Sequence, residues 1–171
     1  MEDPDFKLQT GARALALAEE LIRNYSARSL TIALAESCTA GLAADFLARV
    51  PGASSVLWGS FVCYTLEAKV SMLELDRGRL ARYGLVSRET ACDMAVGALE
   101  KSGACVSAAV TGLAGPDGDG SAVPVGTVFA AAATREKGIT GVKEFHFSES
   151  RNRVRALAAL EVLTLLIDNI I

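Results

Sequence analysis

The chain has 171 residues, of which 51% are hydrophobic and 22% are charged, so it can fold around a sizeable core and is not a disordered segment. Its 17 basic and 20 acidic side chains give a formal net charge of −3, which argues against a general nucleic-acid-binding surface. The acidic N-terminal segment lacks an apolar core and Glu161 interrupts the most apolar stretch, so we expect neither a secretory signal nor a membrane span.

The first half of the chain alternates helical and strand patterns. Apolar residues recur at helical spacing in some segments, and other segments are continuous apolar runs or are rich in β-formers. The expected elements, in order, are a frayed tail at residues 1–9, a helix at 11–27, a strand at 30–35, a helix at 39–49, a turn at 51–54, a strand at 56–65 and a helix at 66–75.

The second half continues with one helix and then strands that follow one another. Ser87 is a good N-cap for the first of these helices, and the glycines and prolines of residues 112–126 predict a loop. The expected elements are a helix at 87–101, a buried strand at 105–111, an antiparallel pair at 127–134 and 139–147, and a helix at 148–169. This order predicts a single α/β domain over residues 1–171, with three layers, α/β/α, around a mixed β-sheet.

The four cysteines do not form a metal-binding pattern. No C-x-x-C pair occurs among Cys38, Cys63, Cys92 and Cys105, and His146 is the one histidine in the sequence. We therefore expect no metal site and free thiols in a reducing cytoplasm.

Polar residues stand where the first predicted strand meets the next helix, at Glu36-Ser37-Cys38-Thr39. Ser37 is either an ordinary helix cap or a nucleophile next to backbone N–H groups that can hold an oxyanion. The sequence has no G-x-S-x-G and no S-x-x-K motif, and His146 lies in an alternating strand, so a Ser-His-Asp triad is not expected.

Lys69 is the candidate base for Ser37. A lysine in a first helical turn is opposed by the helix dipole, and enclosure would lower its pKa further, toward values at which an amine accepts a proton. Tyr64 could relay that proton or hold the amine. The alternative is that Lys69 is an ordinary solvated charge.

Two more segments are candidates for ligand binding. The glycine-rich loop follows a buried strand, where α/β proteins usually place ligands, although it is neither a P-loop nor G-x-G-x-x-G. Arg151 and Arg155 lie four residues apart and so share a helix face, where an anion could bridge a guanidinium and the helix end. A plain connection and a solvated basic turn remain the alternatives.

Five segments in order resemble the C-terminal domain of the CinA proteins. They are AESCTAG (35–41), GSFVCYTLEAK (59–69), GLVSRETACDMAVGAL (84–99), VTGLAGPDGDGSAVPVGTV (110–128) and FSESRNRVR (147–155). The resemblance covers roughly residues 10–168. It implies an enzyme that hydrolyses the carboxamide of nicotinamide mononucleotide to nicotinic acid mononucleotide and ammonia. Ala40 stands where the family often has glycine, and Glu149-Ser150 replaces its G-D pair.

The resemblance also implies roles for individual residues. Ser37 would be the nucleophile, with Lys69 and Tyr64 as the base and its relay, and Arg151 would bind the ribose phosphate. Backbone N–H groups at Cys38 and Thr39, together with Thr111, would stabilise the oxyanion. Gly112 and Gly115 of the glycine-rich loop would also contact the substrate. No cofactor, nucleic acid or membrane is expected, and homodimers are common for α/β enzymes of this size.

Two alternatives to this activity stay open. One is a non-catalytic module that binds a nucleotide in the same pocket, as a sensor or a platform for partners. The other is an amidase that acts on a different amide, which a comparison of nicotinamide with its mononucleotide would test.

Overall fold

The computed structural model describes residues 4–169. The helices are α1 (Pro4–Ala27), α2 (Leu42–Ala48), the short 3-10 helix η1 (Ala53–Ser55), α3 (Leu66–Leu73), α4 (Arg77–Tyr83), α5 (Arg88–Ser102) and α6 (Arg151–Asp168). The strands are β1 (Ile32–Glu36), β2 (Leu57–Val62), β3 (Val106–Gly112), β4 (Thr127–Thr134) and β5 (Gly138–His146).

The five strands form one mixed sheet with the order β2-β1-β3-β4-β5. The first three neighbours run parallel, and β4 and β5 are antiparallel to the strands beside them. Glu36 lies opposite Val62 of β2 and Val110 of β3, so these three strands end at the same edge. The connections from β1 and β3 leave on opposite sides there, which makes this edge the usual ligand position in α/β sheets.

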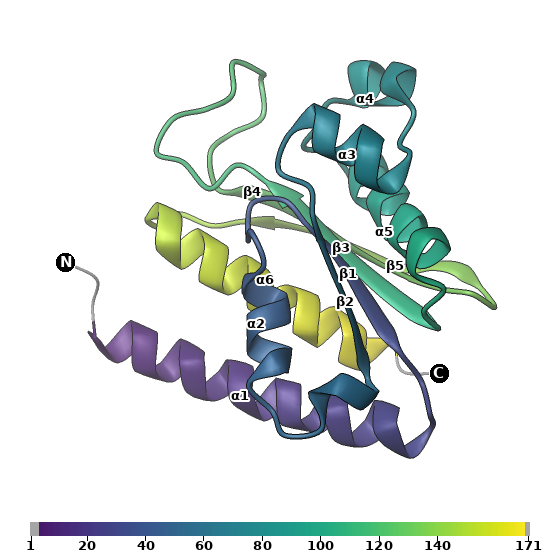
Figure 1. Cartoon of the computed structure of the whole chain (residues 1–171). Coiled ribbons are helices and arrows are strands. Elements are labelled where there is room, and N and C mark those ends of the chain that lie inside the picture. The colour runs from purple at the N-terminus through teal and green to yellow at the C-terminus, as the bar shows by residue number, and fades with distance from the viewer. Residues whose placement is uncertain (1–3, 170–171) are drawn as a thin grey trace.

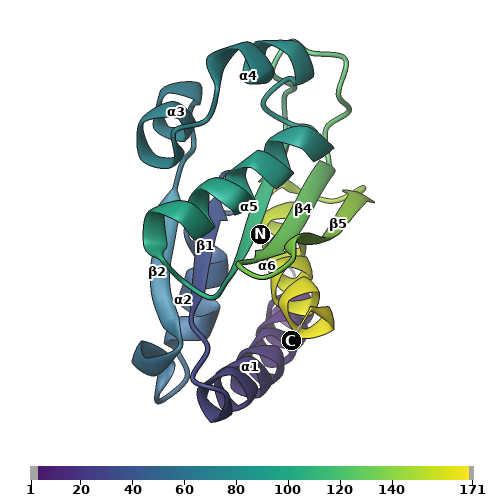
Figure 2. The ribbon, with the colours of Figure 1, turned by 90° about the vertical axis from the view of Figure 1, so that its right-hand side faces the viewer.

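Helices cover both faces of the sheet, as Figures 1 and 2 show. Side chains alternate along each strand, so Ile32 and Leu34 face the cluster that includes α1, α2 and α6, whereas Ala35 faces the cluster that includes α3 and α5. The expected three-layer α/β/α fold with a mixed sheet is therefore confirmed.

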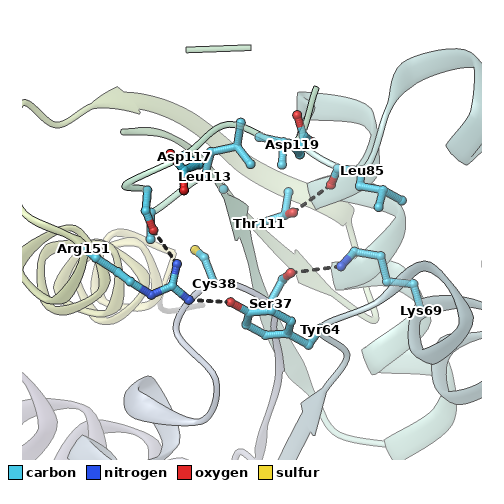
Figure 3. A pocket seen from close by; sticks show the side chains of 14 residues that line it. Ser37, Cys38, Tyr64, Lys69, Leu85, Thr111, Leu113, Asp117, Asp119 and Arg151 are labelled. Atoms are coloured by element: carbon cyan, nitrogen blue, oxygen red, sulfur yellow. Dashed lines mark hydrogen bonds between the residues drawn. The ribbon is translucent and has the colours of Figure 1, made fainter. Parts of the chain in front are cut away.

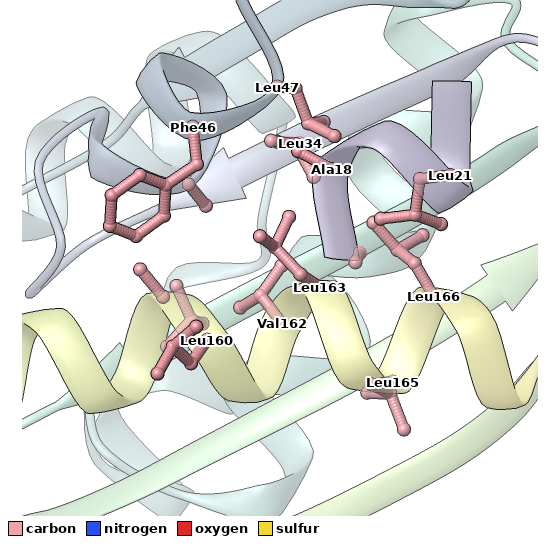
Figure 4. Close-up of a cluster of buried hydrophobic side chains, with 14 of the residues drawn as sticks. Ala18, Leu21, Leu34, Phe46, Leu47, Leu160, Val162, Leu163, Leu165 and Leu166 are labelled. Atoms are coloured by element: carbon pink, nitrogen blue, oxygen red, sulfur yellow. The ribbon is translucent and has the colours of Figure 1, made fainter. Parts of the chain in front are cut away.

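The larger core lies between the sheet and helices α1, α2 and α6. Figure 4 shows Phe46 and Leu47 of α2, Leu21 of α1 and Leu163 of α6 pointing into one cluster, and all four side chains are buried. The hydroxyl of Tyr25 in α1 donates a hydrogen bond to the backbone oxygen of Leu166 in α6, at 3.0 Å. This bond satisfies the polar end of a fully buried tyrosine and joins the two helices.

Three local features differ from the sequence expectations. Helix α1 begins at Pro4, where proline is favoured because a first-turn N–H needs no partner, so residues 4–9 are helical and not a frayed tail. Residues 1–3 of that expected tail lie outside the described residues. Helix α2 begins at Leu42 and not at residue 39. Helix α4, capped by Asp76, was not expected.

Other boundaries agree closely with the expectations. Ser87 caps α5, because its hydroxyl accepts a hydrogen bond from the Thr90 N–H at 3.1 Å. The antiparallel pair β4 and β5 is present. Within residues 4–169, no helix combines the length and the apolar character needed to cross a bilayer.

Candidate active site

A pocket of about 200 Å³ opens at the carboxyl ends of β1 and β3. It lies between the glycine-rich loop after β3 and the segment that carries α3 and α4, both of which extend beyond this edge of the sheet (Figure 1). Eight of the residues selected from the sequence line it: Ser37, Cys38, Tyr64, Lys69, Thr111, Gly112, Gly115 and, from α6, Arg151. The fold thus brings together selected residues from four separate segments of the chain.

Ser37 contacts Lys69 directly. The Lys69 Nζ donates a hydrogen bond of 3.0 Å to the Ser37 Oγ and another of 2.8 Å to the backbone oxygen of Cys63 (Figure 3). The N-cap position of α2 is occupied by Gly41, which makes no side-chain capping bond. Ser37 is therefore not the helix cap that the sequence left as an alternative, and its hydroxyl is paired with an amine.

Lys69 is not a solvated charge. Its side chain is only 1% exposed, and burial lowers the pKa of its amine from the ordinary value of 10.5. Its two hydrogen bonds both go to neutral oxygens. The local cause of its position is the first turn of α3, where the Thr65 hydroxyl caps the helix by accepting from the Ala68 N–H.

Glu36 holds the turn that follows β1, which we call the Ser37 turn (residues 37–41). Its carboxylate is fully buried and accepts hydrogen bonds from the N–H groups of Gly41, Ala43 and Ala44, at 2.9 to 3.1 Å. The Ser60 hydroxyl donates a fourth, at 3.0 Å. Glu36 thus accepts from the N–H groups at the start of α2 that have no partner within the helix. The sequence signal for this role was a carboxylate at the end of an otherwise apolar strand.

Cys38 lies beside Ser37 in the pocket but is a poor nucleophile. Burial raises the pKa of its thiol to about 12, and the side chain is 4% exposed. The thiol stays protonated over the whole physiological range. Of the two adjacent candidate nucleophiles, the environment favours Ser37.

Thr39 and Ala40 complete the Ser37 turn without lining the pocket. Thr39 is fully buried, and its hydroxyl has no hydrogen-bond partner among the described residues. Its side chain is therefore not placed to contact a substrate, and the expected role of its backbone N–H stays a prediction. Ala40 has φ of +52°, a conformation that strains an L side chain and suits glycine.

Arg155 supports the Ser37 turn from the opposite side. Its Nε donates to the backbone oxygen of Cys38 at 3.2 Å, and its Nη2 donates to that of Thr39 at 3.0 Å. Arg151, one helical turn earlier, lines the pocket instead. The two arginines that share a helix face therefore have separate partners.

Thr111 lines the pocket, but its hydroxyl already has an acceptor. It donates a hydrogen bond of 2.7 Å to the backbone oxygen of Leu85, and the side chain is 1% exposed. The expected role as a donor to an oxyanion does not agree with this geometry. Thr111 instead ties β3 to the segment before α5, so that Leu85 and Val86, which the sequence did not single out, line the pocket.

Tyr64 and Arg151 form a pair at the mouth of the pocket (Figure 3). The Arg151 Nη2 donates to the Tyr64 hydroxyl at 2.8 Å, and its Nη1 donates to the backbone oxygen of Gly115. The Tyr64 hydroxyl is thus engaged with Arg151 and not with Lys69 or Ser37, which differs from the expected proton relay. One guanidinium connects the glycine-rich loop, the β2–α3 connection and α6.

The glycine-rich loop packs closely where the sequence has glycine. A Cβ on Gly112 would lie 2.7 Å from a methyl group of Val128, and one on Gly115 would lie 2.7 Å from a methyl group of Val125. Asp117 and Asp119 also line the pocket, and sequence reasoning did not select them. They carry no motif of their own, so only their position in the folded loop reveals them.

His146 is not among the residues that line this pocket. It lies on β5, where its ring contacts Thr127 and Glu144. Within residues 4–169, no group of three or more His, Cys, Asp or Glu side chains is arranged to hold a metal ion.

Comparison with protein families identifies one match over most of the chain. The sequence model of the CinA C-terminal domain matches residues 14–170. A CinA-like protein from Syntrophomonas wolfei is 44% identical over 135 residues, which are 79% of this chain and 32% of the relative. A CinA-like protein from Geobacter metallireducens is 40% identical over 141 residues, 82% of this chain and 34% of the relative. The chain spans about a third of the length of these curated relatives.

Solved structures agree with this assignment. The competence/damage inducible protein CihA from Agrobacterium tumefaciens superposes with a TM-score of 0.87 at 37% identity, covering 91% of this chain and 94% of that one. A CinA superfamily protein from Escherichia coli gives a TM-score of 0.87 at 33% identity, covering 92% and 90%. These structures match both the fold and nearly the full length of the chain.

Proposed function

This chain belongs to the CinA C-terminal domain family, and on that premise we propose that it is an amidohydrolase acting on nicotinamide mononucleotide. The carboxamide would be hydrolysed to the carboxylate, with nicotinic acid mononucleotide and ammonia as products. The observation that carries the proposal is the 3.0 Å contact between the Ser37 Oγ and the Nζ of a lysine that is 1% exposed. A hydroxyl paired with a buried amine is a nucleophile with its own base.

Lys69 acts as the base in its neutral form. Burial lowers its pKa, which increases the fraction of uncharged amine near neutral pH. In that form the contact with Ser37 reverses, and the hydroxyl donates to the amine nitrogen. The second hydrogen bond, to the backbone oxygen of Cys63, keeps the amine aimed at Ser37.

The reaction then proceeds by acyl transfer. The Ser37 oxygen attacks the carboxamide carbon while Lys69 takes its proton, and the tetrahedral intermediate collapses as Lys69 returns that proton to the leaving nitrogen. Ammonia departs, and an ester joins Ser37 to the nicotinoyl group. Water, deprotonated by Lys69, attacks this ester and releases the acid, after which Ser37 recovers its proton.

Backbone N–H groups of the Ser37 turn stabilise the oxyanion in this proposal. Cys38 and Thr39 follow the nucleophile directly, and Arg155 holds both of their carbonyl oxygens. Loss of a single oxyanion donor typically raises a barrier by about 2.7–4 kcal/mol, so a fixed turn matters for the rate. Thr111 acts here by holding Leu85 and not as a donor.

The phosphate end of the substrate lies at the pocket mouth. Arg151 is exposed there, and Tyr64, which is 49% exposed, presents an aromatic face beside it. A guanidinium binds phosphate through two parallel N–H groups, which Arg151 can offer by releasing Tyr64 or Gly115. The proposed chemistry uses only side chains, backbone N–H groups and water.

The four cysteines are unpaired, which favours a reducing compartment such as the cytoplasm.

The decisive experiment is Ser37→Ala with nicotinamide mononucleotide and measured ammonia. We expect the rate of ammonia release to fall by at least ~1,000-fold, with an unchanged far-UV circular dichroism spectrum, because the nucleophile is absent. Mass spectrometry of the wild-type protein during turnover should detect the nicotinoyl ester on Ser37.

The controls separate this activity from the alternatives. Nicotinamide without its ribose phosphate should be a much poorer substrate, because Arg151 then has no anion to bind. Tight binding of the mononucleotide by the wild-type protein without ammonia release would instead favour a non-catalytic nucleotide-binding module. Turnover of Ser37→Ala at the wild-type rate would contradict the mechanism.

A further inference from the structure

A second cavity, of about 380 Å³, lies where the N-terminal parts of α1 and α6 meet α2. Three cationic side chains line it, Lys7, Arg49 and Arg155, and none of its lining residues is acidic. Phe6 from α1 and Leu42 and Phe46 from α2 supply the large apolar side chains of its wall, and the neutral polar residues Thr10 and Asn152 also line it. Figure 4 shows Phe46 extending from α2 over the N-terminal half of α6.

The charge of Arg155 is not balanced by a carboxylate in its hydrogen bonds. Its contacts go to the backbone oxygens of Cys38 and Thr39 and, at 3.5 Å, to the Oδ1 of Asn152, all of which are neutral. The guanidinium has more N–H donors than these three contacts use. A partly buried cation of this kind is stabilised by an anion, and the cavity provides the space for one.

The two other cations are exposed and come from different parts of the chain. Lys7 lies on α1 and Arg49 follows α2, where it pairs with Asp45 and stacks over the Phe46 ring at 5.4 Å. Arg49 is 56% exposed despite this pair, so it can turn toward a ligand at low cost. Three cationic side chains from three parts of the chain therefore line one cavity that also contains two phenylalanine rings.

This cavity is coupled to the Ser37 turn through Arg155. The same guanidinium lines the cavity and holds the carbonyl oxygens of Cys38 and Thr39, the two residues after Ser37. An anion that bound Arg155 would change the hydrogen bonds that fix the turn. Arg151, which lines the first pocket, is not part of the lining of the second.

From these observations we propose that the second cavity is a binding site for a phosphate monoester of a flat ring compound, and that its occupancy is transmitted to the Ser37 turn. The cations bind the phosphate, and the phenylalanine and leucine side chains pack against the ring. The shared chemistry is that of aryl phosphates and nucleotides. This site is separate from the pocket that contains Ser37, and it does not depend on the activity proposed for that pocket.

Phenyl phosphate is a suitable probe, titrated into the ¹⁵N-labelled full chain and followed by amide chemical shifts. We expect saturable shifts at Gly11, Leu42 and Asn152 around the cavity, which extend to Cys38 and Thr39. Inorganic phosphate should shift the same amides with lower affinity, because it lacks the ring. Shifts confined to the cavity would overturn the coupling to the turn.

The test variant is the double substitution Lys7→Gln and Arg49→Gln. Both side chains are exposed, so the fold should be kept, and the loss of two charge-assisted contacts should weaken phenyl phosphate binding by about tenfold or more. Arg151→Gln is the matched control, since it removes a cation from the Ser37 pocket and should leave the affinity unchanged. The proposal is overturned if the double variant binds like the wild type, if Arg151→Gln abolishes binding, or if the wild type shows no saturable binding.

Discussion

Lys69 is the residue on which the proposed chemistry depends, because its proton equilibrium sets the reactivity of Ser37. Its amine is buried and contacts only neutral oxygens through hydrogen bonds, so the folded chain holds its pKa below the ordinary 10.5. Cys38, the other nucleophile nearby, has its pKa raised to about 12 by the same kind of burial. Burial therefore lowers the pKa of the amine and raises the pKa of the thiol. The neutral amine is a base, whereas the neutral thiol is a poor nucleophile.

The pH dependence follows from the direction of the Lys69 shift. We expect kcat/KM to rise with pH along a limb whose midpoint lies below 10.5, since the neutral amine is the active form. The same shift affects folding, because between the folded-state pKa of Lys69 and 10.5 the unfolded chain binds more protons at this amine than the folded chain does. The free energy of unfolding therefore increases with pH across this interval and decreases as the pH falls.

A pH–rate profile of the wild type and of Cys38→Ala checks this expectation. The ascending limb should keep its midpoint in Cys38→Ala, because a thiol with a pKa of about 12 does not titrate in that range. A midpoint at the value of a free lysine would show that the pKa of Lys69 is not lowered, and a limb that disappears in Cys38→Ala would show that the thiol controls the rate.

Glu36 is the second residue with a position-setting role. Its carboxylate accepts four hydrogen bonds and needs no donor of its own, so Glu36→Gln would turn one oxygen into an N–H₂ group facing existing donors. We expect this substitution to lower the free energy of unfolding by about 3 kcal/mol. Urea denaturation measures the loss.

Ser60→Ala is the matched comparison for Glu36→Gln. It removes one of the four donors and leaves the three backbone contacts, so a loss of about 1 kcal/mol is expected. Equal losses in the two variants would mean that the carboxylate does not act as the cap of α2. Amide hydrogen exchange at Ala43 and Ala44 would locate the effect.

At the scale of elements, the packing of α5 against α3 fixes where Lys69 stands. Gly97, in the middle of α5, lies so close to the end of α3 that an added Cβ would be 2.8 Å from the backbone oxygen of Leu73. Lys69 is one turn earlier on the same helix. A glycine that weakens α5 as a helix therefore allows the contact that places the candidate base.

Gly97→Ala tests this contact. Helix propensity alone would make the substitution stabilising, but the clash with backbone should prevail and lower the free energy of unfolding by about 1–3 kcal/mol. Gly11→Ala in α1 is the control, since its added Cβ meets nothing within 4 Å and should stabilise by about 0.5–1 kcal/mol. The two measurements together separate packing from propensity, and a stabilised Gly97→Ala would refute the argument.

At the scale of the whole molecule, both cores are built on one sheet. Ala130 of β4 belongs to the cluster with α1, α2 and α6, whereas its neighbour Ala131 belongs to the cluster with α3 and α5. Because alternate residues of the same strands belong to the two clusters, unfolding of these strands would disrupt both clusters. This shared sheet argues for one cooperative unit, as expected from the sequence for a single domain.

Cooperativity can be measured with two probes of different regions. Trp58, the one tryptophan of the sequence, lies on β2 and stacks with Phe61 at 5.4 Å, whereas far-UV circular dichroism reports on all helices. We expect both signals to show the same midpoint in urea, as in a two-state transition. Separate midpoints would show that the layers unfold independently.

Local patterns were sufficient for much of the structure. Helical spacing, apolar runs and the Ser87 cap predicted most elements and the mixed sheet, because these signals arise from neighbours along the chain. Helix α4 and the first turns of α1 were not predicted, because residues 77–83 and 4–9 contain few apolar residues at helical spacing. Motifs in chain order predicted the family, and the match of the CinA C-terminal domain model to residues 14–170 confirmed it.

Residue types and their order along the chain were enough to predict the fold class, the family and the candidate pair Ser37 and Lys69. The side-chain partners emerged only in the folded chain: Glu36 caps a helix, Thr111 binds Leu85, and Arg151 contacts Tyr64. The physical reason is that a hydroxyl or guanidinium has several possible acceptors in a folded chain. The acceptor that it contacts depends on how strands and helices far apart in sequence pack together, so local residue type and spacing do not reveal it.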